Sequence, residues 1–419
     1  MHTRFVAAVL LASGLSASGA AAVYLFAGEN AEPRSEKKNA RGRMHGQRPN
    51  ESLQKWKARR TQMIRRCSDR DPYGYFTLRG RPFITRTDIS PDFTADTALY
   101  MEMLHRDYKK AYQKVGLPPG DAKELIEVIV FADRKTYLEN GGSEGSGGYF
   151  RRAIGFPDRP ANWPVRHYRL AMFTSGEHDF DKWEKGTLKH EAAHMELQLR
   201  LGFLTDCPRW WNEGQASVFE DWDFDLSVEE NLAAIPRRGR YAPVIRRAYG
   251  TDKFKPFDYV WTIDPASWHS DMTSEQGALN YAQAWSLAAF MLHEGVNGRK
   301  AFMRIFKLSL TVGADREIST TGTKTRAWEQ SFTRNDQRVM ESQWTGWIEK
   351  NLPRKEANRD EWEGLLDMGY DPRHDEELVP LTPETRKELR RGRQGTAGPG
   401  SVSGSGGRPD KKKPPRQGE

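Results

Sequence analysis

Residues 190–194 read HEAAH and combine two histidines with one glutamate. Residues four positions apart lie on one face of an α-helix, so His190 and His194 can each direct a ring nitrogen toward a common point. Two histidine ligands of one metal ion need this arrangement. Glu191 projects about 100° away around the helix, where it can reach a water on the metal without being forced to bind the ion. The motif therefore predicts a helix that binds a metal and activates water.

Two histidines do not complete such a site, because a catalytic zinc ion has three protein ligands and keeps a fourth position open for water. Glu213 follows His194 after eighteen intervening residues. We expect the first helix to end near Gly202. A second helix, beginning at Trp210 or Trp211, then returns Glu213 to the side of the first. The two histidines and this glutamate are the predicted ligands of one Zn²⁺ per chain.

Metal-bound histidines usually donate their second ring N–H to a carboxylate or a backbone carbonyl. Glu220 lies two turns after Glu213 on the same helix face and is the first candidate for this role. Asp221 is the second candidate. Both residues are equally compatible with solvent-facing charges, so the alternative is left open.

The HEAAH motif, the eighteen-residue spacer up to Glu213 and the WNEGQA segment that contains this glutamate resemble the signature of gluzincin zinc metallopeptidases, including the aminopeptidase type. The layout is also similar to secreted bacterial gluzincin-like domains of unknown function, which place a glycine-tyrosine turn before the motif and Y-x-Q-x-W after it. Here these pieces are GGYF at 147–150 and YAQAW at 281–285. The resemblance covers residues 70–350 and implies a zincin-like fold. It implies that His190, His194 and Glu213 are the zinc ligands.

The resemblance implies a peptidase in which Glu191, as general base, helps a zinc-bound water to attack a peptide carbonyl and then passes the proton to the leaving amine. Tyr281 lies 68 residues after Glu213, a separation similar to that of the transition-state tyrosine in aminopeptidase-type gluzincins. It is the expected oxyanion donor, and a packed core tyrosine is the alternative. His269 is the rival, since a histidine has this role in thermolysin-like relatives. The aminopeptidase motif that captures a free amino terminus is missing, which favours an endopeptidase.

Two other functional classes compete with this interpretation. One is a catalytically silent protein of the cell envelope that keeps its zinc for structure and binds a polymer or a partner. The other is a di-iron protein, because Glu191-x-x-His194 has the spacing E-x-x-H and a second copy occurs at Glu102 and His105. A di-iron bundle needs two further inward-facing glutamates on long helices, whereas strands and a glycine-rich loop separate these segments. Glu102 and His105 are better explained as the exposed side of an amphipathic helix.

The hydrophobic pattern changes character halfway along the chain. It predicts a β-hairpin over residues 75–87, a helix over 92–115, and strands over 124–133 and 167–174 on either side of a glycine-rich turn. The gluzincin resemblance implies an edge strand that binds the substrate backbone, and 167–174 is the candidate for it. The second half is predicted to form helices at 181–203, 211–222, 277–294, 299–310 and 338–352. The expected fold class is α+β, with a small mixed β-sheet followed by a mainly helical half.

The extreme N-terminus carries an uncharged run from Phe5 to Ala27, which is typical of an export signal or a membrane anchor. Ala20 and Ala22 offer a cleavage site, and either outcome places the rest outside the cytoplasm: in the periplasm, in the medium or at the outer face of the membrane. The predicted segments are 1–27 as signal peptide or anchor, 28–66 as basic polar linker, 67–355 as metallopeptidase domain, 356–391 as charged extension and 392–419 as disordered basic tail.

The composition argues against two further classes of protein. The formal net charge of +8 comes mainly from the low-complexity flanks, where basic residues stand without interleaved aromatic residues. This pattern favours a solvated tail or contact with an anionic surface over specific nucleic-acid binding. Cys67 and Cys207 are the two cysteines, which excludes a disulfide scaffold and a thiolate zinc cluster. One bridge between them and two free thiols both remain open.

Overall fold

The computed structural model describes residues 46–48, 50–120, 123–154, 166–176, 178–180, 185–203, 205–263, 265–271, 274–314, 332–352, 362, 364–366, 368–374 and 377–395. The chain divides into two compact units, Met1–Pro380 and Leu381–Glu419. The predicted N-terminal segment 1–27, the linker up to residue 45 and the tail from residue 396 lie outside the described residues. Among the described residues, no helix is both long enough and apolar enough to cross a bilayer.

The first unit contains a five-stranded mixed sheet with the order β1-β2-β3-β5-β4. Strands β1 and β2 form the predicted antiparallel hairpin, β2, β3 and β5 run parallel, and β4 is antiparallel to β5. The bounds of the strands are Phe76–Arg79 for β1, Phe83–Thr87 for β2, Leu125–Phe131 for β3, Gly148–Ile154 for β4 and Arg166–Phe173 for β5. The mixed sheet and the helical second half confirm the predicted α+β class.

The prediction of the edge strand was wrong. Strand β5, predicted as the edge at 167–174, has hydrogen-bonded neighbours on both sides, and the edge strand next to it is β4. The chain leaves the glycine-rich segment directly into β4 and then folds back, so that β5 fills the place between β4 and β3. Arg151 and Arg152 interrupt the apolar pattern of β4, and charged residues of this kind are common on edge strands.

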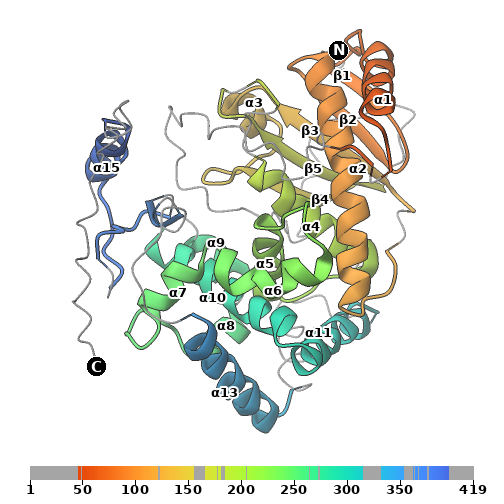
Figure 1. The fold of residues 1–419 in the computed structure, drawn as a ribbon. Coiled ribbons are helices and arrows are strands. Elements are labelled where there is room, and N and C mark those ends of the chain that lie inside the picture. The colour runs from red at the N-terminus through yellow and green to blue at the C-terminus, as the bar shows by residue number, and fades with distance from the viewer. Residues whose placement is uncertain are drawn as a thin grey trace, which may run out of the picture. The chain divides into compact units, whose positions relative to one another are not determined.

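Helices α2 (Pro91–Lys114) and α4 (Gly186–Leu201) pack against the face of the sheet that carries Ile126, Val128 and Val130 (Figure 1). Ser90 ends the loop before α2 and its side chain accepts a hydrogen bond from the backbone of Phe93, which begins the helix as a regular N-cap. The short helix α3 (Arg134–Glu139) contacts the opposite face through Tyr137.

Helix α1 (Leu53–Arg66) packs along α2 through its apolar side chains, which include Trp56 and Met63. Arg60 forms an ion pair with Asp96 of α2, with 2.6 Å between Nε and Oδ1. Cys67 follows α1 and is buried in the same small cluster. Cys67 and Cys207 are both free thiols, so the structure contains no bridge between them.

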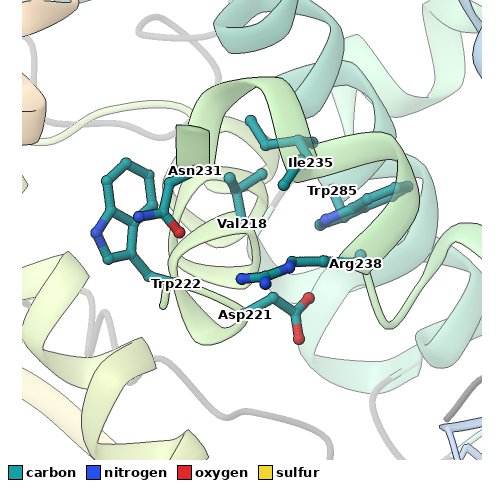
Figure 2. Close-up of a pocket in the computed structure, with 9 residues that line it drawn as sticks. Val218, Asp221, Trp222, Asn231, Ile235, Arg238 and Trp285 are labelled. Carbon is teal, nitrogen blue, oxygen red and sulfur yellow. The ribbon is translucent and has the colours of Figure 1, made fainter. Parts of the chain in front are cut away.

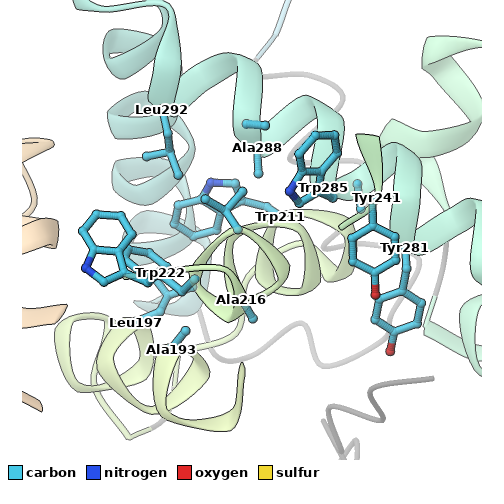
Figure 3. Close-up of a cluster of buried hydrophobic side chains, with 14 of the residues drawn as sticks. Ala193, Leu197, Trp211, Ala216, Trp222, Tyr241, Tyr281, Trp285, Ala288 and Leu292 are labelled. Atoms are coloured by element: carbon cyan, nitrogen blue, oxygen red, sulfur yellow. The ribbon is translucent and has the colours of Figure 1, made fainter. Parts of the chain in front are cut away.

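The helical half is built around α10 (Glu275–His293), whose residues are buried from Gly277 to Leu292. Helix α5 crosses α10 closely at Gly214, where an added Cβ would come within 2.2 Å of the carbonyl oxygen of Ala284. Figure 3 shows Trp211 and Trp285 in the shared core of these helices. The helices of this half are α5 (Arg209–Glu220), α6 (Val228–Arg238), α7 (Ala242–Ala248), α8 (Phe257–Thr262), α9 (Pro265–Asp271), α10 (Glu275–His293), α11 (Val296–Ala314) and α13 (Arg334–Asn351).

The five helices predicted for this half correspond to α4, α5, α10, α11 and α13. The short helices α6 to α9 were not predicted, because each is only two or three turns long and α6 contains Pro236. The second unit contains α15 (Pro383–Gly395), which begins after Thr382; the hydroxyl of Thr382 accepts a hydrogen bond from the backbone of Thr385.

Candidate metal centre

Helices α4 and α5 meet side by side and carry the predicted ligands on their facing surfaces (Figure 1). Helix α4 ends at Gly202, as predicted, and the left-handed backbone of this glycine, with a φ of 88°, turns the chain away from the helix axis. The chain re-enters a helix at Arg209, directly after Pro208. This connection is short enough to return Glu213 to the level of the HEAAH motif.

The structure brings His190, His194 and Glu213 together as one buried group, with their candidate ligand atoms within 4.8 Å of one another. The Oε2 atom of Glu213 lies 3.2 Å from Nε2 of His190 and 3.5 Å from Nε2 of His194. Ligands at about 2.0–2.2 Å around a tetrahedral zinc ion are about 3.3–3.6 Å apart. The group could therefore bind a metal ion, although its geometry alone does not identify the metal.

The second ring nitrogens of both histidines contact oxygen atoms behind the centre. Nδ1 of His194 lies 2.8 Å from Oδ1 of Asn212, and Nδ1 of His190 lies 3.1 Å from Oε1 of Glu220. An oxygen in this place favours a proton on Nδ1, which leaves the Nε2 lone pair free to bind a metal. Both histidines are thus oriented as metal ligands normally are.

Glu220 has the place that the sequence suggested for it, and Asp221 does not. The second carboxylate oxygen of Glu220 lies 3.1 Å from Nη1 of Arg240. Asp221 instead accepts a hydrogen bond from the backbone N–H of Arg240. Asn212 was missed by the sequence analysis, and its position next to Glu213 in WNEG was the available signal.

The charges of the centre are strongly coupled. Burial alone would lower the pKa of His190, but hydrogen bonds to Glu213 and Glu220 outweigh it and raise this pKa to about 10. Burial opposes ionisation of Glu213, yet Arg209 and the two histidines hold its pKa well below the usual range. Glu213 therefore carries the negative charge that a cation would need.

Glu191 is fully buried, and neither of its carboxylate oxygens has a hydrogen-bond partner among the described residues. Burial raises the pKa of Glu191 well above its usual range, against the opposing charge of His190. The first residue of β4, Gly148, lies against it: an added Cβ there would come within 3.2 Å of Cγ of Glu191 and 2.8 Å of Cγ2 of Thr187. The start of the edge strand therefore forms one wall of the centre.

Arg209 and Tyr281 lie on the far side of Glu213. Nη2 of Arg209 is 3.0 Å from Oε1 of Glu213, and the same guanidinium interacts with the hydroxyl of Tyr281. Burial raises the pKa of Tyr281 well above 10, and Glu213 adds to this shift, so the phenol keeps its proton. Sequence analysis had not singled out Arg209.

The rival His269 is exposed on α9, whereas its neighbour Trp268 is buried with its ring edge-on to Tyr281 at 5.0 Å between centroids. The structure thus connects Tyr281 to the centre through Arg209, and it leaves His269 at the surface. The two residues of the di-iron alternative are also engaged elsewhere: His105 pairs with Glu196, and Glu102 pairs with Arg59.

A small crevice lies behind α5, between α5, α6 and α10 (Figure 2). It offers about 10 Å³, which is room for about one water. Its lining includes Asp221, Arg238 and Trp285 but none of the candidate ligands. This crevice is therefore too small for a substrate and separate from the centre.

No protein-family model, curated protein or solved structure matches the chain. Membership of the gluzincins consequently stays a prediction from the motif.

Proposed function

We propose that the protein is a zinc-dependent hydrolase that cleaves amide bonds of peptides or proteins as an endopeptidase. One observation carries the proposal: Glu191, a fully buried carboxylate to which none of the described residues donates a hydrogen bond, stands beside a convergent set of two histidines and one glutamate. Buried polar groups are normally satisfied, so an exception of this kind indicates a catalytic group or a missing ligand.

The donor set fits zinc. Two imidazole nitrogens and one carboxylate oxygen form the three-ligand combination found in catalytic zinc sites, and His190, His194 and Glu213 would hold the ion. The buried Nε2 of His194 has no hydrogen-bond partner among the described residues, as expected of an atom that binds a metal. When bound, zinc supplies Lewis acidity, which polarises a carbonyl and lowers the pKa of a water.

The remaining chemistry falls to side chains of the chain itself. Glu191 would accept the proton of the attacking water and pass it to the leaving amine. Burial raises the pKa of Glu191, which suits a proton carrier, and a nearby cation would favour its ionised form. Tyr281 would donate its phenolic hydrogen to the oxyanion that develops on the carbonyl oxygen.

The place of action is proposed to be outside the cytoplasm, on the basis of the uncharged segment 5–27. A catalytically silent zinc protein of the cell envelope would carry the same ligands, so it serves as the competing outcome of the test.

The decisive experiment compares Glu191→Gln with His190→Ala in purified protein. Metal content is measured per chain, and a peptide library is digested with and without a chelator, with the cut sites identified by mass spectrometry. We expect about one zinc in the wild type, near-normal zinc without cleavage in Glu191→Gln, and loss of zinc in His190→Ala.

Equal zinc in both variants would contradict the ligand assignment. Zinc in the wild type without any cleavage would favour the silent binding protein. Cuts confined to the first residues of the peptides would indicate an aminopeptidase in place of an endopeptidase.

A further inference from the structure

We propose that Arg209 is a positioning residue that restricts Glu213 to a single metal-binding oxygen and orients the hydroxyl of Tyr281 toward the substrate. This inference rests on the proposed metal site. It assigns a function to a side chain that lies beside the ligands and has none in the proposed reaction.

The two oxygens of Glu213 have different neighbours. Oε2 faces the histidines, 3.2 Å from Nε2 of His190, whereas Oε1 lies 3.0 Å from Nη2 of Arg209. Glu213 is fully buried and the side chain of Arg209 is only 10% exposed, so water does not screen their attraction. Turning Oε1 toward a metal would leave a buried guanidinium without its carboxylate, which is costly.

Arg209 lies at a position where an arginine is unfavourable for the stability of its own helix. It is the first residue of α5, where the helix dipole repels a cation, and no acidic residue stands in this first turn. An arginine four residues before a glutamate is also the less favourable order for a helical ion pair. Stability of α5 therefore does not explain the pair, which favours a role in the centre.

The same guanidinium reaches Tyr281. A guanidinium can only donate, so its interaction with Tyr281 is made through the phenolic oxygen and leaves the hydroxyl hydrogen to point elsewhere. A planar fork with several donors can hold a carboxylate and a hydroxyl at fixed relative positions, which a lysine cannot do equally well. Arg209 thereby couples the third ligand to the expected oxyanion donor.

A glutamate that binds through one oxygen leaves more of the coordination shell for water and substrate. In Arg209→Met, Oε1 is released, and we expect Glu213 to bind the metal through both oxygens. The variant also removes a positive charge close to the ion. Its affinity for zinc should therefore be equal to or higher than that of the wild type, while hydrolysis falls by about 10- to 100-fold.

The matched control is Arg240→Met, which removes the arginine that supports Glu220 behind His190 but leaves Glu213 and Arg209 in contact. We expect this variant to lose about tenfold in zinc affinity with an unchanged coordination number. The two variants are thus expected to differ in two measurements that do not need substrate, the affinity for zinc and the coordination number.

The test uses the full chain loaded with zinc for X-ray absorption and with Co²⁺ for visible absorption, next to chelator competition for affinity. The expected result is a rise from about four to about five ligand atoms in Arg209→Met, with a weaker visible band, and no such change in Arg240→Met. Identical spectra for the wild type and Arg209→Met would overturn the role of Arg209. Circular dichroism of the metal-free variants controls for folding.

Failure of this inference is distinct from failure of the proposed function. If the wild type binds no stoichiometric metal, the metal site itself is wrong. If it binds metal and loses it in His190→Ala, yet Arg209→Met keeps four ligand atoms, only the assignment of Arg209 falls.

Discussion

The molecule contains two clusters of buried charge, one around Glu127 in the sheet and one around Glu191 on α4. They shift the pKa of their glutamate in opposite directions. In the sheet, Glu127 of β3 lies 2.8 Å from Nη1 of Arg86 and also pairs with Arg169. Burial opposes its ionisation, but His167 and the two arginines hold its pKa at about 2. In the centre, Glu191 is buried to the same degree, and its pKa is raised well above the usual range.

The difference separates a structural cluster from a candidate site. Each oxygen of Glu127 faces a guanidinium, so this carboxylate is fully paired within the chain. Glu191 has no hydrogen-bond partner among the described residues, and two histidine nitrogens beside it converge on a single carboxylate oxygen. Burial alone therefore does not mark a functional group; an unpaired buried carboxylate beside convergent ligand atoms is the feature that indicates one here.

The largest effect on stability is expected from removing Glu127 from the charge cluster of the sheet. Glu127→Ala removes the buried carboxylate that pairs with both Arg86 and Arg169, and we expect it to destabilise the fold by about 3–5 kcal/mol, measured by urea unfolding. The control is Glu102→Ala, which removes the half-exposed partner of Arg59 and should cost less than about 1 kcal/mol. Equal losses in the two variants would contradict the distinction between a buried network and a surface pair.

The pH dependence of stability sharpens the comparison. The folded-state pKa of Glu127 is about 2, below its ordinary value of 4.5, so ionised Glu127 contributes stability that is present above pH 4.5. This contribution, about 3 kcal/mol, is lost as the pH falls through 4.5 toward 2. We therefore expect the unfolding free energies of wild type and Glu127→Gln to differ at pH 6 and to converge near pH 2. A difference that is constant over this range would refute the assigned pKa.

Zinc should stabilise the fold through the centre on α4 and α5, independently of the Glu127 cluster in the sheet. If zinc binds at His190, His194 and Glu213, a metal concentration of 100 times Kd stabilises the folded state by about 2.7 kcal/mol. Thermal unfolding should show this increment in the wild type and in Glu127→Gln. It should vanish in His190→Ala, and an undiminished increment there would place the metal elsewhere.

The sequence was informative where chemistry depends on short spacings. The interval of four residues between His190 and His194 fixes their common helix face, and the short connection to α5 limits where Glu213 can lie. Hydrophobic periodicity likewise predicted α2, α4, α5 and α10, because each is long and apolar on at least one side.

Features that depend on contacts between distant segments were not accessible in this way. The edge position of β4 depends on which neighbour β5 pairs with, and strand order is not encoded in the pattern of either strand. Arg209 and Asn212 acquire their roles only when α5 lies against α4. Glu127 appeared merely as a charged residue in an apolar strand until the register placed arginines of two other strands around it.

The smallest expected effect concerns the wall of the centre formed by β4. An alanine at Gly148 would place its Cβ 2.8 Å from Cγ2 of Thr187 and 3.2 Å from Cγ of Glu191, so α4 or β4 must shift by a few tenths of an ångström. We expect Gly148→Ala to cost about 1 kcal/mol of stability and to reduce hydrolysis more than zinc content, because Glu191 moves while the ligands stay. Gly346→Ala on α13 is the control, since nothing lies within 4 Å of its Cβ, and it should be neutral or stabilising by up to about 1 kcal/mol. Full activity in Gly148→Ala would show that the edge strand does not set the position of Glu191.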